Sequence, residues 1–222
     1  MGAATRVFQS AGLGMVIMLG ACMLGDPGTE NEETPAARIM PFGKAKSKQA
    51  FAAPFLRYRG GPVIPNVKVQ ALYWGPGVVG TQNIESFYSY ITQSPHIDWL
   101  SEYNTPTQAI GRGSFVGAVV DPAPPGGRLV DDSQIRAEVL RRINDGTLQP
   151  NDENTMYMVH FPPGYRITMG GSQSCSSFCA YHSSLNRAGQ RVFYAVMPDF
   201  GGACAGGCGG GTQAQNTTSV SA

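Results

Sequence analysis

Strand-like and helix-like patterns alternate between residues 54 and 200, and this alternation limits the possible folds more than any other feature of the sequence. Segments rich in β-branched and aromatic residues predict strands at 67–74, 113–120, 154–161 and 190–200. Apolar residues at helical spacing predict helices at 81–94 and 131–146. The order strand, helix, strand, helix, strand, strand is typical of an α/β domain. We therefore expect a mixed sheet of about four strands, at least partly parallel, with flanking helices.

Individual elements differ in how clearly they are marked. The helix at 131–146 has an apolar stripe of Ile135, Val139 and Ile143, and either Asp131 or Asp132 can cap its start. The strand at 154–161 is dense in apolar residues, so we expect it to lie in the middle of the sheet. Between this strand and the last one, the sequence predicts a long loop.

The N-terminus is typical of a secretory signal at 1–21. One charged residue, Arg6, precedes a short apolar run that ends in "LGAC" at Cys22. This ending resembles a bacterial lipobox, which would make Cys22 the lipidated first residue and attach the protein to a membrane. Ordinary secretion with cleavage nearby is the alternative. Residues 22–53 are rich in Glu, Pro, Ala, Lys and Ser and predict a flexible tether before a domain at 54–222.

The charge balance argues against a nucleic-acid partner. Without Arg6, the only charged residue of the signal, the chain has 15 basic and 15 acidic residues. It also lacks a basic run with interleaved aromatic residues, which nucleic-acid binding favours. A membrane, reached through a lipid on Cys22, is the one partner that the sequence indicates; the substrate or binding partner stays open.

Four further cysteines occur as two close pairs, "CSSFC" and "CAGGC". An even set in an exported chain favours disulfides. Each pair could close a small loop, or the two loops could be cross-linked, and a four-thiolate zinc site is the alternative. The residues concerned are Cys175, Cys179, Cys204 and Cys208.

No catalytic set emerges from residue spacing alone. The sequence has no HExxH, no two histidines four apart and no G-x-S-x-G. His160, at the end of the third predicted strand, and His182, after the first cysteine pair, are weak candidates for a metal site. A hydrogen-bonded structural histidine and an ordered loop residue are the simpler interpretations, and we expect His96 to be a surface or packing residue. We therefore expect no cofactor in this chain.

Several separated motifs together resemble one family. The stretches "YRGGPVIPNVKVQALYWG", "DWLSEYNTPTQAIGRGSF", "DDSQIRAEVLRRI", "NTMYMVHFPPG", "CSSFCAYH" and "FYAVMPD" are similar to the bacterial branch of the phosphate-induced proteins, the EXORDIUM family. The resemblance runs from Tyr58 to the last residue. Plant members are extracellular proteins linked to growth and to phosphate or carbon status, but the family name supplies no biochemical activity.

The resemblance also implies a metal-binding helix that this sequence does not contain. In the bacterial branch, the segment similar to "NTTSVSA" continues into a His-Glu-Leu-x-Glu-Ala stretch, like the active-site helix of zinc peptidases of the zincin type. Here only Ala222 follows Ser221. We therefore expect a zincin-like domain that is truncated at its C-terminus and inactive, with a natural short form as the alternative. The resemblance implies that full-length relatives are metal-dependent hydrolases of peptidase type, with zinc as a possible metal. A non-catalytic cell-surface binding or signalling module is the alternative.

Overall fold

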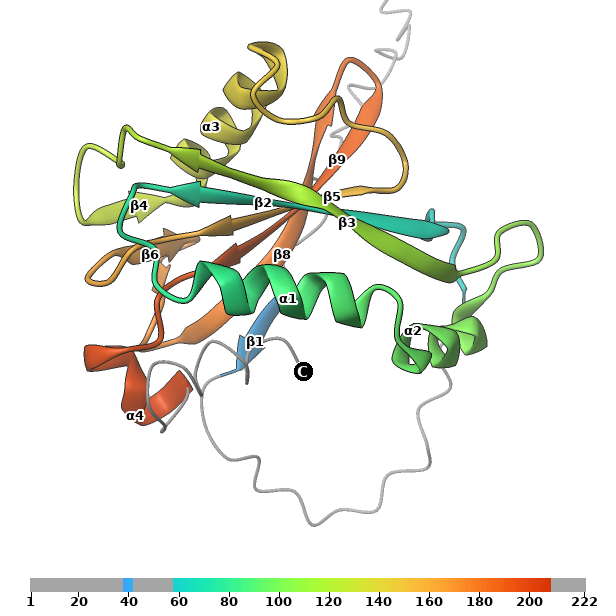
Figure 1. Cartoon of the computed structure of the whole chain (residues 1–222), viewed down its shortest axis with the longest axis horizontal. Coiled ribbons are helices and arrows are strands. Elements are labelled where there is room, and N and C mark those ends of the chain that lie inside the picture. Colours follow the sequence, from blue (N-terminus) through green and yellow to red (C-terminus); the bar gives the residue numbers. More distant parts are fainter. Residues whose placement is uncertain (1–37, 42–57, 209–222) are drawn as a thin grey trace, which may run out of the picture. The chain divides into compact units, whose positions relative to one another are not determined.

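A computed structural model describes residues 38–41 and 58–208. The predicted signal at 1–21, Cys22, most of the predicted tether and the segment 209–222 lie outside the described residues. The described part is an α/β domain in which helices lie on both sides of a mixed sheet (Figure 1). The α/β prediction is therefore confirmed at this level.

The main sheet has the strand order β1-β8-β9-β5-β2-β3. β3, β2, β5 and β9 run parallel to one another, while β8 is antiparallel to β9 on one side and to β1 on the other. Its strands are β1 (Arg38–Pro41), β2 (Asn66–Trp74), β3 (Gly111–Asp121), β5 (Thr155–His160), β8 (Phe178–Arg187) and β9 (Gln190–Met197). As expected, β5 is central, between β2 and β9.

A second, smaller sheet has the order β4-β6-β7, with β4 (Leu129–Asp131), β6 (Arg166–Met169) and β7 (Ser172–Gln173). The helical elements are α1 (Thr81–Ile91), α2 (Pro95–Trp99), the 3₁₀ turn η1 (Leu100–Tyr103), α3 (Asp132–Asn144), the 3₁₀ turn η2 (Gly202–Cys204) and α4 (Ala205–Cys208). In the described ranges, no helix is both long and apolar enough to cross a bilayer.

The long loop predicted between β5 and the last strand is wrong, because this stretch contains β6, β7 and β8. β8 forms a hairpin with β9 through a two-residue turn. Ala188 and Gly189 have φ of 50° and 78°, as tight hairpin turns of the primed types require. The stretch "SCSSFCAYHSS" contains no β-branched residue, so a search for such residues does not find this strand.

The two faces of the main sheet pack against different helices. On the first face, Val69, Ala71 and Tyr73 of β2 pack against Ile84 and Tyr88 of α1. We call this the α1 face. On the other face, which we call the α3 face, α3 packs against the alternate residues of β2, β5 and β9.

Hydrogen bonds fix the start of α3. Asp131 is the N-cap: its side chain accepts a hydrogen bond from the Ser133 amide at 3.0 Å, and Gln134 completes a capping box. Asp132, the other predicted cap, instead accepts hydrogen bonds from the hydroxyls of Tyr181 and Tyr194 at 2.6 and 2.7 Å. α3 is therefore tied at its first turn to β8 and β9.

A buried ion pair ties the other half of α3 to the sheet. The side chain of Asp121, at the end of β3, is fully buried. It accepts hydrogen bonds from Arg142 Nε at 3.1 Å and from the Ala123 amide at 2.9 Å, and Glu138 also pairs with Arg142. Burial opposes the ionisation of Asp121, but the hydrogen bonds from Arg142 and Ala123 outweigh it and lower the pKa of this carboxyl.

Candidate functional site

The carboxyl ends of β2 and β5 form the part of the sheet where a ligand is expected. From β2 the chain crosses through α1 to β3, whereas from β5 it leads away toward β8 and β9. The strand order therefore reverses between β2 and β5, and open α/β sheets bind ligands at such a point. Tyr73 and His160 are paired in register there, at the ends of the two strands.

His160 is part of a group that we call the edge cluster: Tyr73, Glu85, Tyr88 and His160, of which Glu85 is half-buried and the others are buried. Its Nε2 lies 2.9 Å from the Tyr88 hydroxyl, and the centre of its ring lies 5.6 Å from that of Tyr73. The Tyr73 hydroxyl donates to Glu85 Oε1 at 3.3 Å. The cluster thus joins the ends of β2 and β5 to one side of α1.

Burial sets the protonation of this cluster. It lowers the pKa of His160 to about 3, because the buried ring loses the solvent that would stabilise its charged form. Burial also raises the pKa of Tyr88 and Tyr73 above the ordinary tyrosine value. At neutral pH, His160 and Tyr88 therefore form a neutral hydrogen-bonded pair.

His182 lies on β8 and not in a loop, and its side chain is exposed. It is opposite Ala195 of β9, while His160 is opposite Met197 of the same strand. Both histidines therefore point to the α1 face, but β9 lies between their strands, which puts them roughly 10 Å apart across the sheet. The fold does not bring the two weak metal candidates together.

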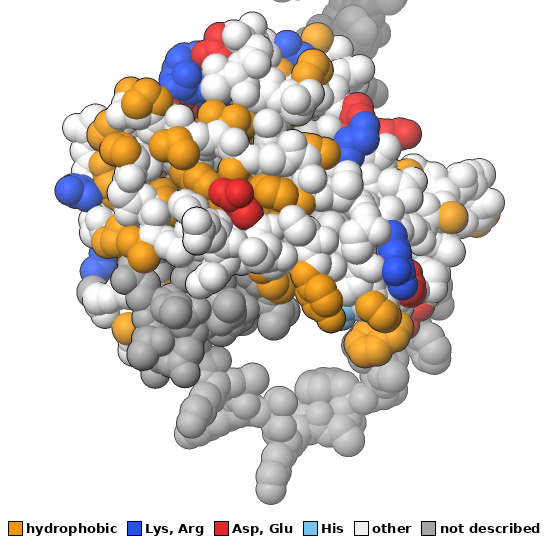
Figure 2. Space-filling model, viewed as in Figure 1, with side chains coloured by type: hydrophobic (Ala, Val, Ile, Leu, Met, Phe, Trp, Pro, Cys, Tyr) orange, Lys and Arg blue, Asp and Glu red, His pale blue; other side chains and the backbone are white. Residues whose placement is uncertain are grey.

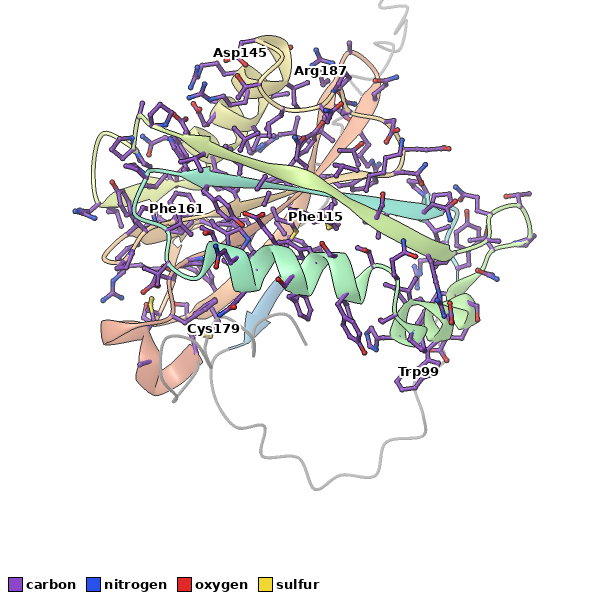
Figure 3. The ribbon with its side chains drawn as sticks, in the orientation of Figure 1. Trp99, Phe115, Asp145, Phe161, Cys179 and Arg187 are labelled. Atoms are coloured by element: carbon purple, nitrogen blue, oxygen red, sulfur yellow. A yellow bond between two sulfur atoms is a disulfide. The ribbon has the colours of Figure 1, made fainter. Side chains whose placement is uncertain are left out.

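All four later cysteines are in disulfides, as predicted. Cys175 is bonded to Cys204 with Cα atoms 4.6 Å apart, and Cys179 to Cys208 with Cα atoms 5.4 Å apart. Of the pairings left open by the sequence, the structure has two that cross-link the loops, and the alternative of a four-thiolate zinc site is wrong. Figure 3 shows Cys179 beside α4, which the bonds hold against the start of β8.

The described residues do not form a zinc site by themselves. Within 38–41 and 58–208, no three His, Cys, Asp or Glu side chains gather in a way that could hold a metal ion. Nε2 of His160 is engaged with Tyr88, and the thiols are oxidised. Zinc at the carboxyl edge would need ligands from outside the described residues.

An apolar pocket of about 330 Å³ lies on the α1 face, next to the edge cluster. Sequence reasoning missed it, because its wall comes from α1, α2 and four strands that are far apart in the chain. Its lining includes Val67, Ile91, Ile97, Met156, Met158 and Ala195. We call it the face pocket. Tyr88, which also contacts His160, connects the pocket to the edge cluster.

The surface beyond α1 carries exposed aromatic side chains. Trp99 of α2 is 72% exposed and stacks edge-on against His96, with ring centres 5.7 Å apart. Figure 3 shows Trp99 pointing away from the sheet, and Figure 2 shows apolar side chains grouped in the same region. His96 is therefore a surface residue, as the sequence predicted.

Comparison of the chain with family models, with curated proteins and with solved structures found no match. The resemblance to the EXORDIUM family and the zincin-like arrangement therefore stay predictions.

The pKa of His160 predicts an acid sensitivity. Unfolded His160 takes up a proton near pH 6.5, while the folded residue stays neutral down to about pH 3, so the free energy of unfolding falls as the pH falls through this range. We expect a slope of about 1.4 kcal/mol per pH unit between roughly pH 6 and 4.5. Urea titrations at several pH values measure it.

Two variants test this assignment. His160→Gln keeps a hydrogen-bonding group for Tyr88 but cannot take up a proton in this pH range. The free energy of unfolding of this variant is therefore expected to depend less steeply on pH, by about 1.4 kcal/mol per pH unit. His96→Gln makes the same substitution at an exposed ring and is the matched control. The pKa of Asp152 is lowered to about 2, so protonation of this carboxylate affects stability at a pH below the range from 6 to 4.5. An unchanged slope in His160→Gln would contradict the prediction.

Proposed function

We propose that this chain is an exported, EXORDIUM-like domain, anchored to a membrane through a lipid on Cys22, that acts as a non-catalytic binding module at the cell surface. The observation that supports it best is the pair of cross-linking disulfides. Such bonds persist in oxidising compartments outside the cytosol. They agree with the signal-like sequence at 1–21.

The carboxyl edge is the proposed binding region. The disulfides hold η2 and α4 at this edge, beside Met197 and Phe200. Below it, Tyr88 and His160 are buried and hydrogen-bonded to each other, so the edge cluster supports the surface rather than offering a free reactive group. A rigid edge at a topological switch point suits recognition of a partner.

A metal-dependent hydrolase of peptidase type, with a zincin-like sheet, is the second candidate. The position of His160 at the carboxyl end of β5 favours it. Zinc would polarise a substrate carbonyl or a water there, with the remaining ligands supplied by a further helix. Zinc content and peptide hydrolysis, measured on this chain and on a version extended through such a helix, separate the two candidates. Activity confined to the extended version supports the hydrolase.

The anchoring part of the proposal is tested by Cys22→Ser. We expect the wild-type chain in the membrane fraction and the variant in the soluble exported fraction, because a serine cannot accept the lipid. Cell fractionation followed by intact-mass measurement shows both location and lipid. If the variant partitions like the wild type, the anchor is wrong, although the binding function would remain open.

A further inference from the structure

β3 is an edge strand of the main sheet, because it pairs with β2 alone among the described strands (Figure 1). Its amino half is covered from outside. The amide of Gly113 donates to the carbonyl of Thr92 at 2.9 Å, and the side chain of Gln93 donates to the carbonyl of Gly113. Both partners belong to the segment that follows α1. The amino half of β3 therefore offers little free backbone to another chain.

The carboxyl half of β3 has backbone groups that point away from the sheet. The carbonyl of Asp121 accepts a hydrogen bond from the Gly75 amide at 3.1 Å, so it points toward β2. Because the backbone groups of successive strand residues point to opposite sides, those of Ala118 and Val120 point away from β2. Within the described part of the chain, no strand pairs with this outer side. Such a row of open amides and carbonyls is a template for a further strand.

The side chains of this half do not protect it. Val120 is 55% exposed, and Figure 2 shows apolar side chains gathered over the carboxyl half of β3. Residues 113–120 contain no charged residue and no proline, which edge strands commonly use against unwanted pairing. A bulge follows Phe115, and the pairing with β2 is regular from there to the end of the strand. We call this regular stretch, Gly117–Asp121, the open edge.

The backbone of the open edge is complementary to itself. An antiparallel pairing centred on Val119 places Ala118 opposite Val120 of a second copy, and Val120 opposite the second copy's Ala118. The backbone groups of these residues point outward, so each of the two pairs can exchange two hydrogen bonds. Pro122, which has no amide hydrogen, limits the pairing at one end, and the bulge limits it at the other. The open edge thus meets the same stretch in reverse order, with both ends in line.

The side chains also match in this register. Ala118 and Val120 lie on the α1 face, because they are in register with Ala71 and Tyr73 of β2. Val119 lies on the other face, where it packs against the core, and it would meet its own copy at the two-fold axis. Apolar pairs of this kind stabilise neighbouring strands, and no two like charges face each other. The open edge therefore suits a second copy of this chain.

We propose that the open edge of β3 pairs antiparallel with the open edge of a second copy of this chain, so that the two main sheets join in a symmetric dimer. A two-fold pair covers both open edges at once and leaves neither for further growth. The paired stretch is short, and interfaces at the low end of the size range are weak, so we expect dissociation at about micromolar concentration. This dimer is independent of the proposed binding function and of the lipid anchor.

Sedimentation velocity over about 1–200 μM measures the association in the full chain with Cys22→Ser. The sedimentation coefficient of this parent chain is expected to rise with concentration from that of a monomer to that of a dimer. Val120→Lys adds a charge to the open edge and is expected to stay monomeric throughout. Ser114→Lys makes the same change at an exposed position on the covered amino half of β3, and this matched control dimerises like the parent chain.

Each result of this measurement bears on the proposal. A dimer that Val120→Lys abolishes and Ser114→Lys retains supports it. A parent chain that is monomeric at all concentrations overturns it and leaves the edge to a strand of another protein or to none. A dimer that Val120→Lys does not weaken uses a different surface, and this also overturns the proposal.

Disulfide cross-linking tests the register and decides the matter if Val120→Lys does not fold. Residues opposite each other in a non-hydrogen-bonded antiparallel pair have Cα atoms about 4.5 Å apart, which a disulfide can span. In the Cys22→Ser chain, Val119→Cys is therefore expected to form an interchain disulfide on mild oxidation, located by peptide mapping. Ser114→Cys is the control, because its two copies would lie about 33 Å apart along the strands. No link at position 119, or equal linking at both positions, overturns the proposal.

Discussion

Replacing Cys175, Cys179, Cys204 and Cys208 together by serine is expected to lower the free energy of unfolding by about 6 kcal/mol. Each bond joins residues 29 positions apart, so the first bond to form restricts the unfolded chain by about 3.6 kcal/mol. The second then closes only a small ring and adds about 2.7 kcal/mol. This loss is comparable with the whole stability of an ordinary domain.

The crossed arrangement gives the prediction a specific form. Removing one disulfide from the wild type is expected to lower the free energy of unfolding by less than removing the remaining one does. The reason is that either disulfide alone still closes the long loop. Chemical denaturation of Cys175→Ser/Cys204→Ser, of Cys179→Ser/Cys208→Ser and of the fourfold variant measures the three steps. Equal stability of the fourfold variant and the wild type would show that these bonds do not restrict the unfolded chain.

Asp121→Ala is expected to destabilise the domain by about 3–5 kcal/mol. The substitution leaves Arg142, whose side chain is only 13% exposed, without its main carboxylate partner. It also removes the acceptor of the Ala123 amide. Glu138 still pairs with Arg142, so the cost is that of a largely buried charge network that loses one of its carboxylates. Urea denaturation near pH 7 measures it.

Two other variants separate these contributions. Asp121→Asn keeps an acceptor for the Ala123 amide but loses the charge, so it is expected to lie between Asp121→Ala and the wild type. Asp98, which forms a bidentate pair with Arg112 at 2.9 and 2.7 Å on the exposed surface, is the control. Asp98→Ala leaves the unfolding midpoint unchanged, because surface pairs contribute little. If Asp121→Ala and Asp98→Ala lowered the free energy of unfolding by similar amounts, burial would not be the reason for the effect at Asp121.

The elements that the sequence predicted correctly have strong local signals. The apolar spacing of Ile135, Val139 and Ile143 and the cap at Asp131 locate α3 to within two residues at each end. "VKVQALYW" starts with alternating apolar and polar residues, whereas its second part and "MYMVH" are largely apolar because both faces of β2 and β5 are covered in the middle of the sheet. The parallel order then follows from the helices between them.

The missed elements depend on contacts that are distant in sequence. β8 is a strand because β9 pairs with it, and its serines and cysteines have no β preference of their own. Likewise, Tyr88 and His160 meet across 72 positions of the chain, so no spacing rule could pair them. The face pocket is formed by six elements at once, and only the strand order places their side chains together.

The two crossed disulfides also determine how mechanical load and cleavage affect the molecule. Tension on the chain after Cys208 passes through sulfur atoms to β8 at Cys179, so β9 is bypassed and cannot be peeled from the sheet end first. A cut in the β8–β9 turn, at Ala188 or Gly189, likewise leaves the two halves covalently joined. In the exported location that we propose, this part of the protein would therefore withstand a single cut by a protease without separating.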